Sequence, residues 1–337
     1  MQLINKISPV GIQSQAAHIT ARAAVLQAPG KILLRQIVVP PPDPNQVRVR
    51  LEGCGVCASN IPVWQGQEWM EYPLEPGAPG HEAWGRIESV GSIVRGFSIG
   101  DRVAMLSSHS YAEYDLANAH DLVKLPSCLD GLPVPGEALG CAINIFRRSQ
   151  IQNRHAVAIV GIGFLGALLT QLATNAGAHV IAISRRRFAL DLARQFGAKE
   201  TLQWNDSAAV TNRILDLTNG HGCERVIEAV GKQSSLDLAT NLTAERGKLV
   251  IAGYHQDGPR QINMQLWNWR GLDVINAHER DSEVYVQGIV EAISAIQAGT
   301  MDPVPLYTDQ FALDELSKAF SAVAERPDGF LKALISL

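Results

Sequence analysis

The sequence predicts an α/β protein in which a doubly wound parallel sheet is joined to a β-rich domain. Three observations lead to this prediction. A glycine-rich turn lies between an apolar strand and a helical pattern near the middle of the chain, and the segment before it alternates short strand-like runs with turns. The chain has 337 residues, enough for two hydrophobic cores.

The stretch at 156–187 reads as strand, glycine turn, helix and strand, the context in which a glycine pattern becomes specific for a dinucleotide. Residues 157–160 are apolar and rich in β-branched side chains, which is typical of a buried parallel strand. The helical pattern ends at Gly177, and a second apolar strand is expected at 179–183. The turn itself has the sequence Gly161-Ile162-Gly163-Phe164-Leu165-Gly166.

The three glycines of this turn are expected to have separate roles. Gly161 permits the tight turn, Gly163 lets the backbone approach a pyrophosphate, and Gly166 lets the helix lie close to the strand. The phosphates would lie at the helix N-terminus, beside Phe164 and Leu165. The alternative, a glycine turn of an ordinary α/β domain, is disfavoured by the flanking strands.

Composition excludes several classes of protein. The chain is 46% hydrophobic and 18% charged, as soluble globular proteins are, and its net charge of -4 argues against binding to nucleic acid or an anionic membrane. No apolar run is long enough to cross a membrane, and residues 1–20 are expected to be a flexible extension without a signal sequence. An odd, sparse set of cysteines favours the cytoplasm, with reactive or metal-binding thiols: Cys54, Cys57, Cys128, Cys141 and Cys223.

The remaining elements follow from local patterns. In the first part of the chain, strands are expected at 23–26, 32–39, 47–51 and 87–90, a loop at 53–60, and a turn from 94 that leads into a strand at Val103. In the last part, strands are expected at 225–230, 248–253, 272–276 and 331–337, with helices at 292–298 and 311–324.

Four motifs occur in a fixed order: Gly-Val-Cys, Gly-His-Glu, Gly-Asp-Arg-Val and the glycine turn. In this order, from about residue 21 onward, the chain resembles the zinc-dependent medium-chain alcohol and polyol dehydrogenases. The resemblance implies a GroES-like β-rich catalytic domain at 21–150 and 302–337, and a Rossmann cofactor domain at 151–301. It also implies a zinc ion and a nicotinamide cofactor.

The resemblance implies that Cys57 and His81 are the first two zinc ligands. Glu137 is preferred to Cys141 as the third, because polyol-type members carry a glutamate at about this separation before the glycine turn. Glu82 is the other carboxylate expected to enter or leave the metal shell. The alternatives are a small buried hydrophobe for Cys57, a turn residue for His81 and a surface or helix-terminal charge for Glu137. The other cysteines are interpreted as structural, and the family's four-cysteine structural zinc lobe is absent from 103–114.

The resemblance places a proton-relay hydroxyl at Ser59. Two neighbours depart from the family. Asn60 replaces a frequent aspartate and is expected to accept a hydrogen bond from His81, and Pro62 stands where several relatives carry a relay histidine, so the proton would leave through the cofactor ribose and water. Aromatic residues either wall the substrate cleft or pack against the β-domain: Trp64, Trp69 and Tyr72.

The end of the second strand favours NADP(H) over NAD. An acid here would accept from the adenosine ribose, but the sequence is Ser184-Arg185-Arg186-Arg187. Ser184 leaves room for a 2′-phosphate, and Arg185 and Arg186 can bind it. The alternative is a solvated basic helix start. By resemblance, Val230 lies near the cofactor and Gly253 near the nicotinamide.

We therefore expect an oxidoreductase that interconverts a secondary alcohol (a polyol, cyclitol or sugar derivative) and its ketone. Two alternatives remain, a zinc-free enone or quinone reductase and a non-catalytic cofactor-binding regulatory protein. By resemblance, the strand at 272–276 pairs two subunits, which indicates a homodimer or homotetramer. His278, a lone histidine, is interpreted as structural rather than substrate-facing.

Overall fold

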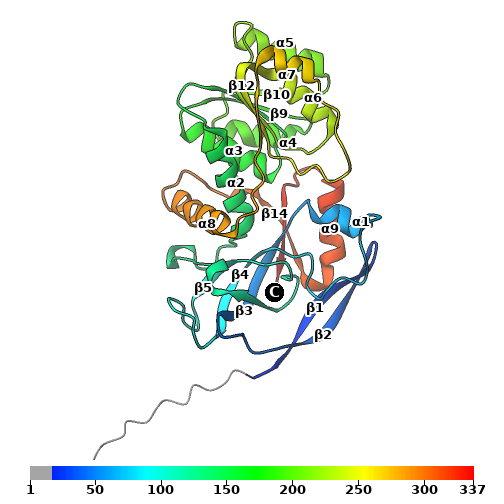
Figure 1. The fold of residues 1–337 in the computed structure, drawn as a ribbon, viewed down its shortest axis with the longest axis vertical. Coiled ribbons are helices and arrows are strands. Elements are labelled where there is room, and N and C mark those ends of the chain that lie inside the picture. The colour runs from blue at the N-terminus through cyan, green and yellow to red at the C-terminus, as the bar shows by residue number, and fades with distance from the viewer. Residues whose placement is uncertain (1–16) are drawn as a thin grey trace, which may run out of the picture.

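The structure, a computed structural model, describes residues 17–337. Two lobes are stacked along the long axis of the molecule, with a β-rich lobe at one end and a parallel-sheet lobe at the other (Figure 1). Residues 1–16 of the expected extension lie outside the described range, and Ile19 already belongs to the first strand. Between residues 17 and 337 no helix has the length and apolar content needed to cross a membrane.

The parallel-sheet lobe has six strands in the order β10-β9-β8-β11-β12-β13. Every neighbouring pair is parallel, and the order is that of a doubly wound dinucleotide-binding sheet. The strands are β8 (Ala156–Val160), β9 (His179–Ser184), β10 (Glu200–Gln203), β11 (Cys223–Glu228), β12 (Thr243–Ile251) and β13 (Asp273–Asn276). The helices of this lobe are α3 (Phe164–Asn175), α4 (Arg187–Gln195), α5 (Ser207–Leu217), α6 (Gln233–Leu242) and α7 (Met264–Arg270).

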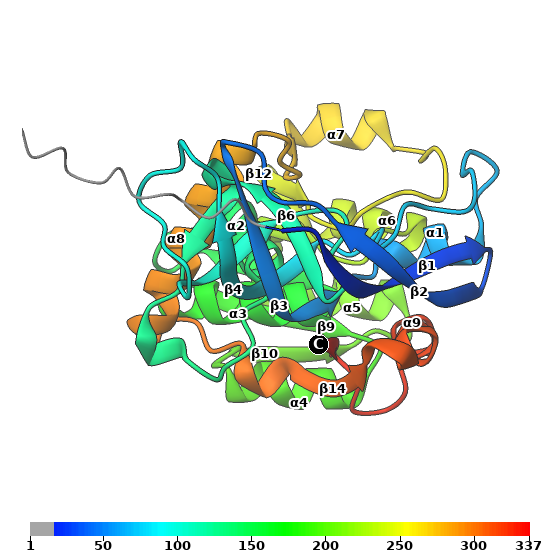
Figure 2. The ribbon, with the colours of Figure 1, turned by 90° about the horizontal axis from the view of Figure 1, so that it is seen from below.

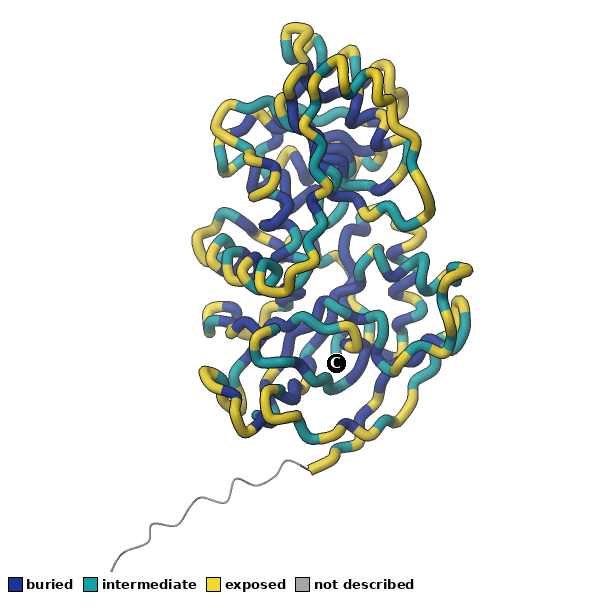
Figure 3. The backbone as a smooth tube through the Cα atoms, in the orientation of Figure 1, coloured by how far each residue is buried: buried dark blue, intermediate teal, exposed yellow. Residues whose placement is uncertain are grey.

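Strand β8 shows why this sheet is stable. Val157 and Ile159 belong to one buried hydrophobic cluster, whereas Ala158 and Val160 belong to another. Side chains alternate between the two faces of a strand, so both faces of β8 are covered and a continuous apolar run is required. Figure 3 shows the buried residues concentrated inside both lobes.

The β-rich lobe contains a seven-stranded sheet in the order β14-β15-β3-β4-β5-β7, with β6 paired to β3, and a separate β1–β2 hairpin. The strands are β1 (Ile19–Ala28), β2 (Lys31–Val39), β3 (Gln46–Val56), β4 (Glu82–Val90), β5 (Arg102–Leu106), β6 (Tyr114–Asn118), β7 (Leu122–Lys124), β14 (Tyr307–Ala312) and β15 (Lys332–Ser336). The remaining helices are α1 (Asn60–Gln65), α2 (Gly136–Ser149), α8 (Ser282–Gln297) and α9 (Leu316–Glu325), with short 3₁₀ turns at Ala119–Asp121, Ser127–Leu129, Val304–Leu306 and Leu313–Glu315. Seen from below, α9 lies near the β1–β2 hairpin (Figure 2).

Two expectations about local structure are wrong. The segment expected to be a loop from Gly53 belongs to β3 as far as Val56. Its glycines are needed for packing against neighbouring side chains, since a Cβ at Gly53 would overlap Trp84 and one at Gly55 would overlap Glu82. These glycines mark close packing inside a strand. The helix expected at 311–324 begins only at Leu316, since Phe311 lies in β14, which pairs with β15.

Helices α2 and α8 join the two lobes. The backbone of α2 comes close to α8, since a Cβ at Gly140 would lie 2.9 Å from the backbone nitrogen of Ile289. Gly136 faces Ala104 of the β-rich lobe on one side and Ile289 on the other. One hydrophobic cluster therefore runs from Trp84 and Ala104 into the parallel-sheet lobe.

Candidate metal and cofactor site

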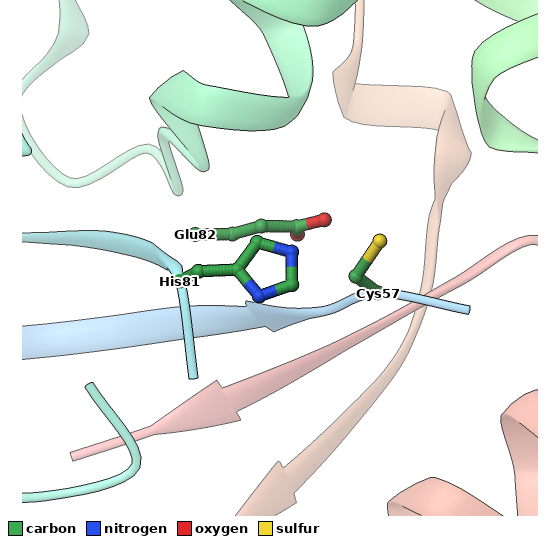
Figure 4. A group of neighbouring side chains, drawn as sticks. All are labelled: Cys57, His81 and Glu82. Carbon is green, nitrogen blue, oxygen red and sulfur yellow. The ribbon is translucent and has the colours of Figure 1, made fainter. Parts of the chain in front are cut away.

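Three potential metal ligands meet at the end of two adjacent strands. Cys57 directly follows β3, His81 directly precedes β4, and Glu82 is the first residue of β4. Because β3 and β4 are antiparallel, with Gly55 opposite Glu82, the end of one strand lies beside the start of the other. One ligand atom from each of the three side chains lies within 4.8 Å of the others. Figure 4 shows the three side chains grouped together.

Hydrogen bonds orient the imidazole of His81. Its Nδ1 lies 2.9 Å from the carbonyl oxygen of Pro79, so Nδ1–H donates there and Nε2 is left to bind a metal. Asn60 does not accept from His81 as expected: its amide oxygen accepts from the Tyr111 hydroxyl at 2.8 Å, and its nitrogen donates to Pro79 at 3.2 Å. Asn60 therefore holds the turn that carries His81.

Glu82 is a buried carboxylate whose only charged partner among the described residues is Lys332. The Glu82 side chain is 1% exposed, and apart from its contact with Lys332 neither carboxylate oxygen has a hydrogen-bond partner in the described chain. The ammonium group of Lys332 forms an ion pair with Glu82, donates to the carbonyl of Val56 at 3.2 Å and lies 4.9 Å from the ring centroid of Phe164. Buried carboxylate oxygens with so few partners, beside a thiol and an imidazole, are suited to bind a divalent cation.

The acidic groups of this site stabilise the positively charged forms of His81 and Lys332. Burial disfavours the charged imidazolium of His81, but the hydrogen bond and charge of Cys57, with Glu137 and Glu82, raise its pKa to about 10. Burial acts against the Lys332 ammonium as well, yet Glu82 and Cys57 raise the pKa of Lys332. The sulfur, nitrogen and oxygen donors fit the zinc ion that the sequence implies.

Glu137 lies beside this group and outside it. It is on the first turn of α2, close enough to His81 and Glu82 to interact with their charges, and burial raises its pKa, against a hydrogen bond from Tyr285 of α8. Among residues 17–337 the compact donor set contains Glu82 and not Glu137. Cys141 is one turn further along α2, and burial raises the pKa of its thiol well above the usual value.

The glycine turn has the features expected of a dinucleotide site. Gly161 has a φ of +100°, which favours glycine, and a Cβ at Gly166 would overlap the carbonyl oxygen of Gly161. A Cβ at Gly163 would meet nothing within 4 Å, so this glycine leaves open space in front of α3, which begins with Phe164 and Leu165. Phe164 stacks on Tyr307 with ring centroids 6.0 Å apart. Because Lys332 contacts both Glu82 and the ring of Phe164, it connects the metal group with the glycine turn.

Two family models match separate parts of the chain. The model described as the alcohol dehydrogenase GroES-like domain matches residues 43–127, and that of zinc-binding dehydrogenases matches residues 165–294. The chain belongs to the zinc-type medium-chain dehydrogenases.

Relatives of this dehydrogenase align over most of its length. It is 24% identical to the sorbitol dehydrogenase of Halalkalibacterium halodurans, with 87% of this chain and 93% of the relative covered. It is 26% identical to the D-arabitol-phosphate dehydrogenase of Enterococcus avium, with 91% and 95% covered. A protein from Sinorhizobium meliloti assigned as a zinc-binding dehydrogenase, solved with NADP bound, is 25% identical, with a TM-score of 0.80 and coverage of 95% and 100%. These findings support the expected cofactors, Zn²⁺ and NADP(H).

The three residues at the basic end of β9 make different contacts in this dehydrogenase. Ser184 is buried, and its hydroxyl accepts from the backbone N–H of Arg186 at 3.2 Å. Arg185 is exposed, with its guanidinium 4.5 Å from the ring centroid of Trp204. Arg186 donates to the carbonyl of Ile162 at 3.3 Å and to that of Phe330 in the other lobe. Arg185 is thus the freer of the two for a phosphate.

Val230 and Gly253 lie at the carboxyl edge of the sheet, where doubly wound folds bind ligands. The buried carboxylate of Glu228 accepts the N–H groups of Val230 and Gly231, each at 2.8 Å. A Cβ at Gly253 would overlap Gly231, so the two turns are packed together. His278 lies 3.2 Å from the Gly253 carbonyl, and burial lowers its pKa, in keeping with a structural role.

The residues around Ser59 are mostly packed. Trp64 lies against Phe320 with ring centroids 5.7 Å apart, and the Tyr72 hydroxyl donates to the carbonyl of Val63 at 2.5 Å. Trp69 is 62% exposed. Trp64 and Tyr72 therefore follow the packing alternative.

Sequence reasoning missed three residues of this region: Lys332, Tyr285 and Gln256. Lys332 left a local signal, because it is a single cation followed by three apolar residues in a buried strand. A charge at such a position requires a buried partner. Tyr285 and Gln256 left none, since a tyrosine in a helix and a glutamine in a loop are common.

Proposed function

We propose that this protein is a zinc-dependent, NADP(H)-linked dehydrogenase that interconverts a secondary alcohol and its ketone. The observation that carries the proposal is the compact group of Cys57, His81 and Glu82, joined through Lys332 to the dinucleotide turn. Neither half suffices by itself, because hydride transfer needs the substrate oxygen and the nicotinamide in one cleft.

Cys57 and His81 would hold the zinc ion together with one carboxylate. Zinc supplies Lewis acidity, which lowers the pKa of an alcohol and polarises a ketone. The structure favours Glu82 as the third ligand because it already lies within the group, whereas the expected ligand Glu137 lies outside. That Glu137 is a ligand stays a prediction.

The remaining residues have assigned roles in the proposal. The pyrophosphate would lie at the start of α3, where there is room for it beside Gly161, Gly163 and Gly166. Ser184 leaves room for the 2′-phosphate, and Arg185 donates hydrogen bonds to it. Ser59 passes the alcohol proton toward the cofactor ribose and water, because Pro62 supplies no histidine for the relay. Val230 and Gly253 would hold the nicotinamide, which supplies hydride transfer when the cofactor is bound.

The substrate class we propose is a polyol, cyclitol or sugar derivative. It is supported by similarity to a sorbitol dehydrogenase and a D-arabitol-phosphate dehydrogenase. A polyol-type metal shell also agrees with the site, since the charges of both Glu82 and Glu137 act on His81. We also propose a GroES-like domain at 21–150 and 302–337, a Rossmann domain at 151–301, a homodimer or homotetramer, and a cytoplasmic location, for which five unpaired cysteines argue.

Elemental analysis coupled to a substrate screen tests this function. Metal-replete protein should contain one zinc per chain and oxidise at least one polyol or sugar alcohol, with NADPH formation followed by its absorbance. Turnover of enones or quinones by protein free of zinc would instead support the reductase alternative. No turnover of any alcohol or ketone by zinc-loaded protein would support a regulatory protein.

A further inference from the structure

One hydrogen bond crosses between the lobes beside the metal group. The side-chain amide of Gln256 donates to the backbone carbonyl of Ser59 at 3.1 Å, across 197 residues of sequence. Gln256 lies in the loop between β12 and α7 of the parallel-sheet lobe. Ser59 lies two residues after Cys57, immediately before α1.

The loop that carries Gln256 is anchored by its neighbour, His255. The imidazole Nε2 of His255 donates to the buried carboxylate of Glu228 at 3.0 Å, and Nδ1 accepts from Nε–H of Arg260 at 2.8 Å. Both ring nitrogens are therefore occupied, and the partners fix the neutral tautomer. Because both ring nitrogens are bonded, the His255 side chain has little freedom. The neighbouring Gln256 therefore projects from a defined position.

The same anchor holds the backbone of the expected nicotinamide site. Glu228 binds the N–H groups of Val230 and Gly231 through its other oxygen, and Arg260 donates to the carbonyl of Gly231 at 3.0 Å. The Gln256 loop and the Val230–Gly231 turn are thus connected through shared partners.

Among the described residues, the Cys57–Asn60 loop has no other hydrogen bond to the parallel-sheet lobe. The Asn60 side chain ties the loop to Tyr111 and Pro79 of the β-rich lobe. The backbone hydrogen bonds are local: Asn60 N–H donates to the Cys57 carbonyl at 3.1 Å and Ile61 N–H to the Ala58 carbonyl at 3.2 Å. These bonds shape the turn but do not fix it relative to the parallel-sheet lobe. The Gln256 amide supplies that connection at the residue expected to transfer the proton.

We propose that Gln256 is a positioning residue that couples occupancy of the dinucleotide site to the order of the Cys57–Asn60 loop. The proposal rests on the proposed function for the role of Ser59, and the coupling itself is measurable without turnover. When the dinucleotide is bound, the Gln256 contact holds the Ser59 hydroxyl and the Cys57 thiolate in register with the nicotinamide.

Hydrogen–deuterium exchange tests the coupling in the zinc-loaded full-length protein. The comparison is between wild type, Gln256→Leu, which removes the amide at similar volume, and Gln287→Leu, a matched change at an exposed glutamine whose side chain donates to Glu291. In wild type, NADPH (or NADH, if only NADH protects the glycine turn) should slow exchange both in that turn and in the peptide carrying Cys57 and Ser59. In Gln256→Leu the cofactor should still protect the glycine turn, but its protection factor for the peptide carrying Cys57 and Ser59 should be at least threefold smaller. Gln287→Leu should keep the protection of both segments.

Kinetics provide the second readout. Gln256→Leu should lower kcat threefold to tenfold while the KM for the cofactor and the zinc content change less than twofold, and it should cause no further loss in a Ser59→Ala background. Unchanged protection of the Cys57 peptide, equal loss at the glycine turn, or losses that multiply with Ser59→Ala would overturn the proposal. Coupled protection in a protein without any dehydrogenase turnover would support the coupling and reject the proposed function.

Discussion

The Glu82–Lys332 pair makes the metal group sensitive to single charges. Both side chains are almost fully buried, and an unpaired buried charge is costly. A divalent cation bound at the proposed site would be a second positive group beside Glu82, in addition to Lys332. The carboxylates of Glu82 and Glu137 together would balance this charge.

Glu82→Gln and Glu137→Gln separate the two candidate third ligands. Because Glu82 lies within the compact donor group, Glu82→Gln should weaken zinc binding more than about 100-fold. Glu137→Gln should weaken it about 10- to 100-fold, as loss of an outer-shell partner does. Competition with a chelator and the visible spectrum of the Co²⁺-substituted protein measure both effects.

Two controls accompany this comparison. The double variant Glu82→Gln/Lys332→Met removes both charges of the pair, so that a folding defect from unpaired Lys332 is recognised. Glu291→Gln changes a partly exposed carboxylate of α8 that pairs with Arg147 and is not a member of the donor group. Stronger zinc loss in Glu137→Gln than in Glu82→Gln would reverse the assignment.

Arg185 should decide the choice of nicotinamide cofactor. A charge-assisted hydrogen bond contributes about 1.5–3 kcal/mol, so Arg185→Ala should weaken NADPH binding roughly 10- to 100-fold and leave NADH binding almost unchanged. Titration of cofactor fluorescence measures both affinities. Arg194→Ala, at an exposed arginine of α4 that pairs with Asp191, is the control. Tighter binding of NADH than of NADPH by the wild type would contradict the assignment.

At the scale of elements, two glycines of the turn before α3 have different roles. Gly166 is needed for packing, and Gly163 is expected to be needed for ligand binding. Gly163 has a φ of -93°, which any residue can adopt, and a Cβ there would meet nothing within 4 Å. Gly163→Ala should therefore leave the melting temperature within about 2 °C of wild type while weakening dinucleotide binding at least tenfold. Calorimetry of unfolding and of cofactor binding measures the two effects.

Gly166→Ala is the matched contrast in the same turn. Its Cβ would overlap the carbonyl of Gly161, and overpacking of this kind costs about 1–3 kcal/mol. The free energy of unfolding should fall accordingly. Equal destabilisation by the two variants would mean that the space in front of Gly163 is not reserved for a ligand.

The elements that could be predicted from the sequence are those with local causes. The unit from β8 to β9 was predicted because its strands are continuous apolar runs, and glycines end its turn and helix. The loop expected from Gly53 begins only at Cys57, because Gly53 and Gly55 lie in β3 and accommodate side chains of β4, which lies elsewhere in the sequence. The helix expected from 311 begins only at Leu316, because Phe311 lies in a strand that pairs with β15.

The candidate site shows the same division. Cys57 and His81 could be proposed because short motifs carry them. The contacts of Lys332 with Val56 and of Gln256 with Ser59 span 276 and 197 residues, so no local pattern encodes them. The choice between Glu82 and Glu137 depends on how α2 lies against β4, which is also a non-local property.

At the scale of the whole molecule, the free edge of β13 predicts self-association. This strand ends the six-stranded sheet, and Trp269 of the preceding α7 is 86% exposed. We expect the chain to form at least a dimer through this side, and Trp269→Glu should shift it toward monomers at low micromolar concentration. Light scattering after gel filtration measures the mass. Trp69→Glu, at a 62% exposed tryptophan of the other lobe, is the control. A monomeric wild type, or equal dissociation by both variants, would contradict this expectation.

The position of β15 has a consequence for biosynthesis. This strand lies between β14 and β3 and brings Lys332 to Glu82, yet it is translated 276 residues after the segment it joins. Until β15 has been synthesised, residues 53–56 of β3 have no strand on one side and Glu82 lacks its partner Lys332. The β-rich lobe therefore completes its sheet only after β15 has been made, whereas the six-stranded parallel sheet needs no strand beyond β13.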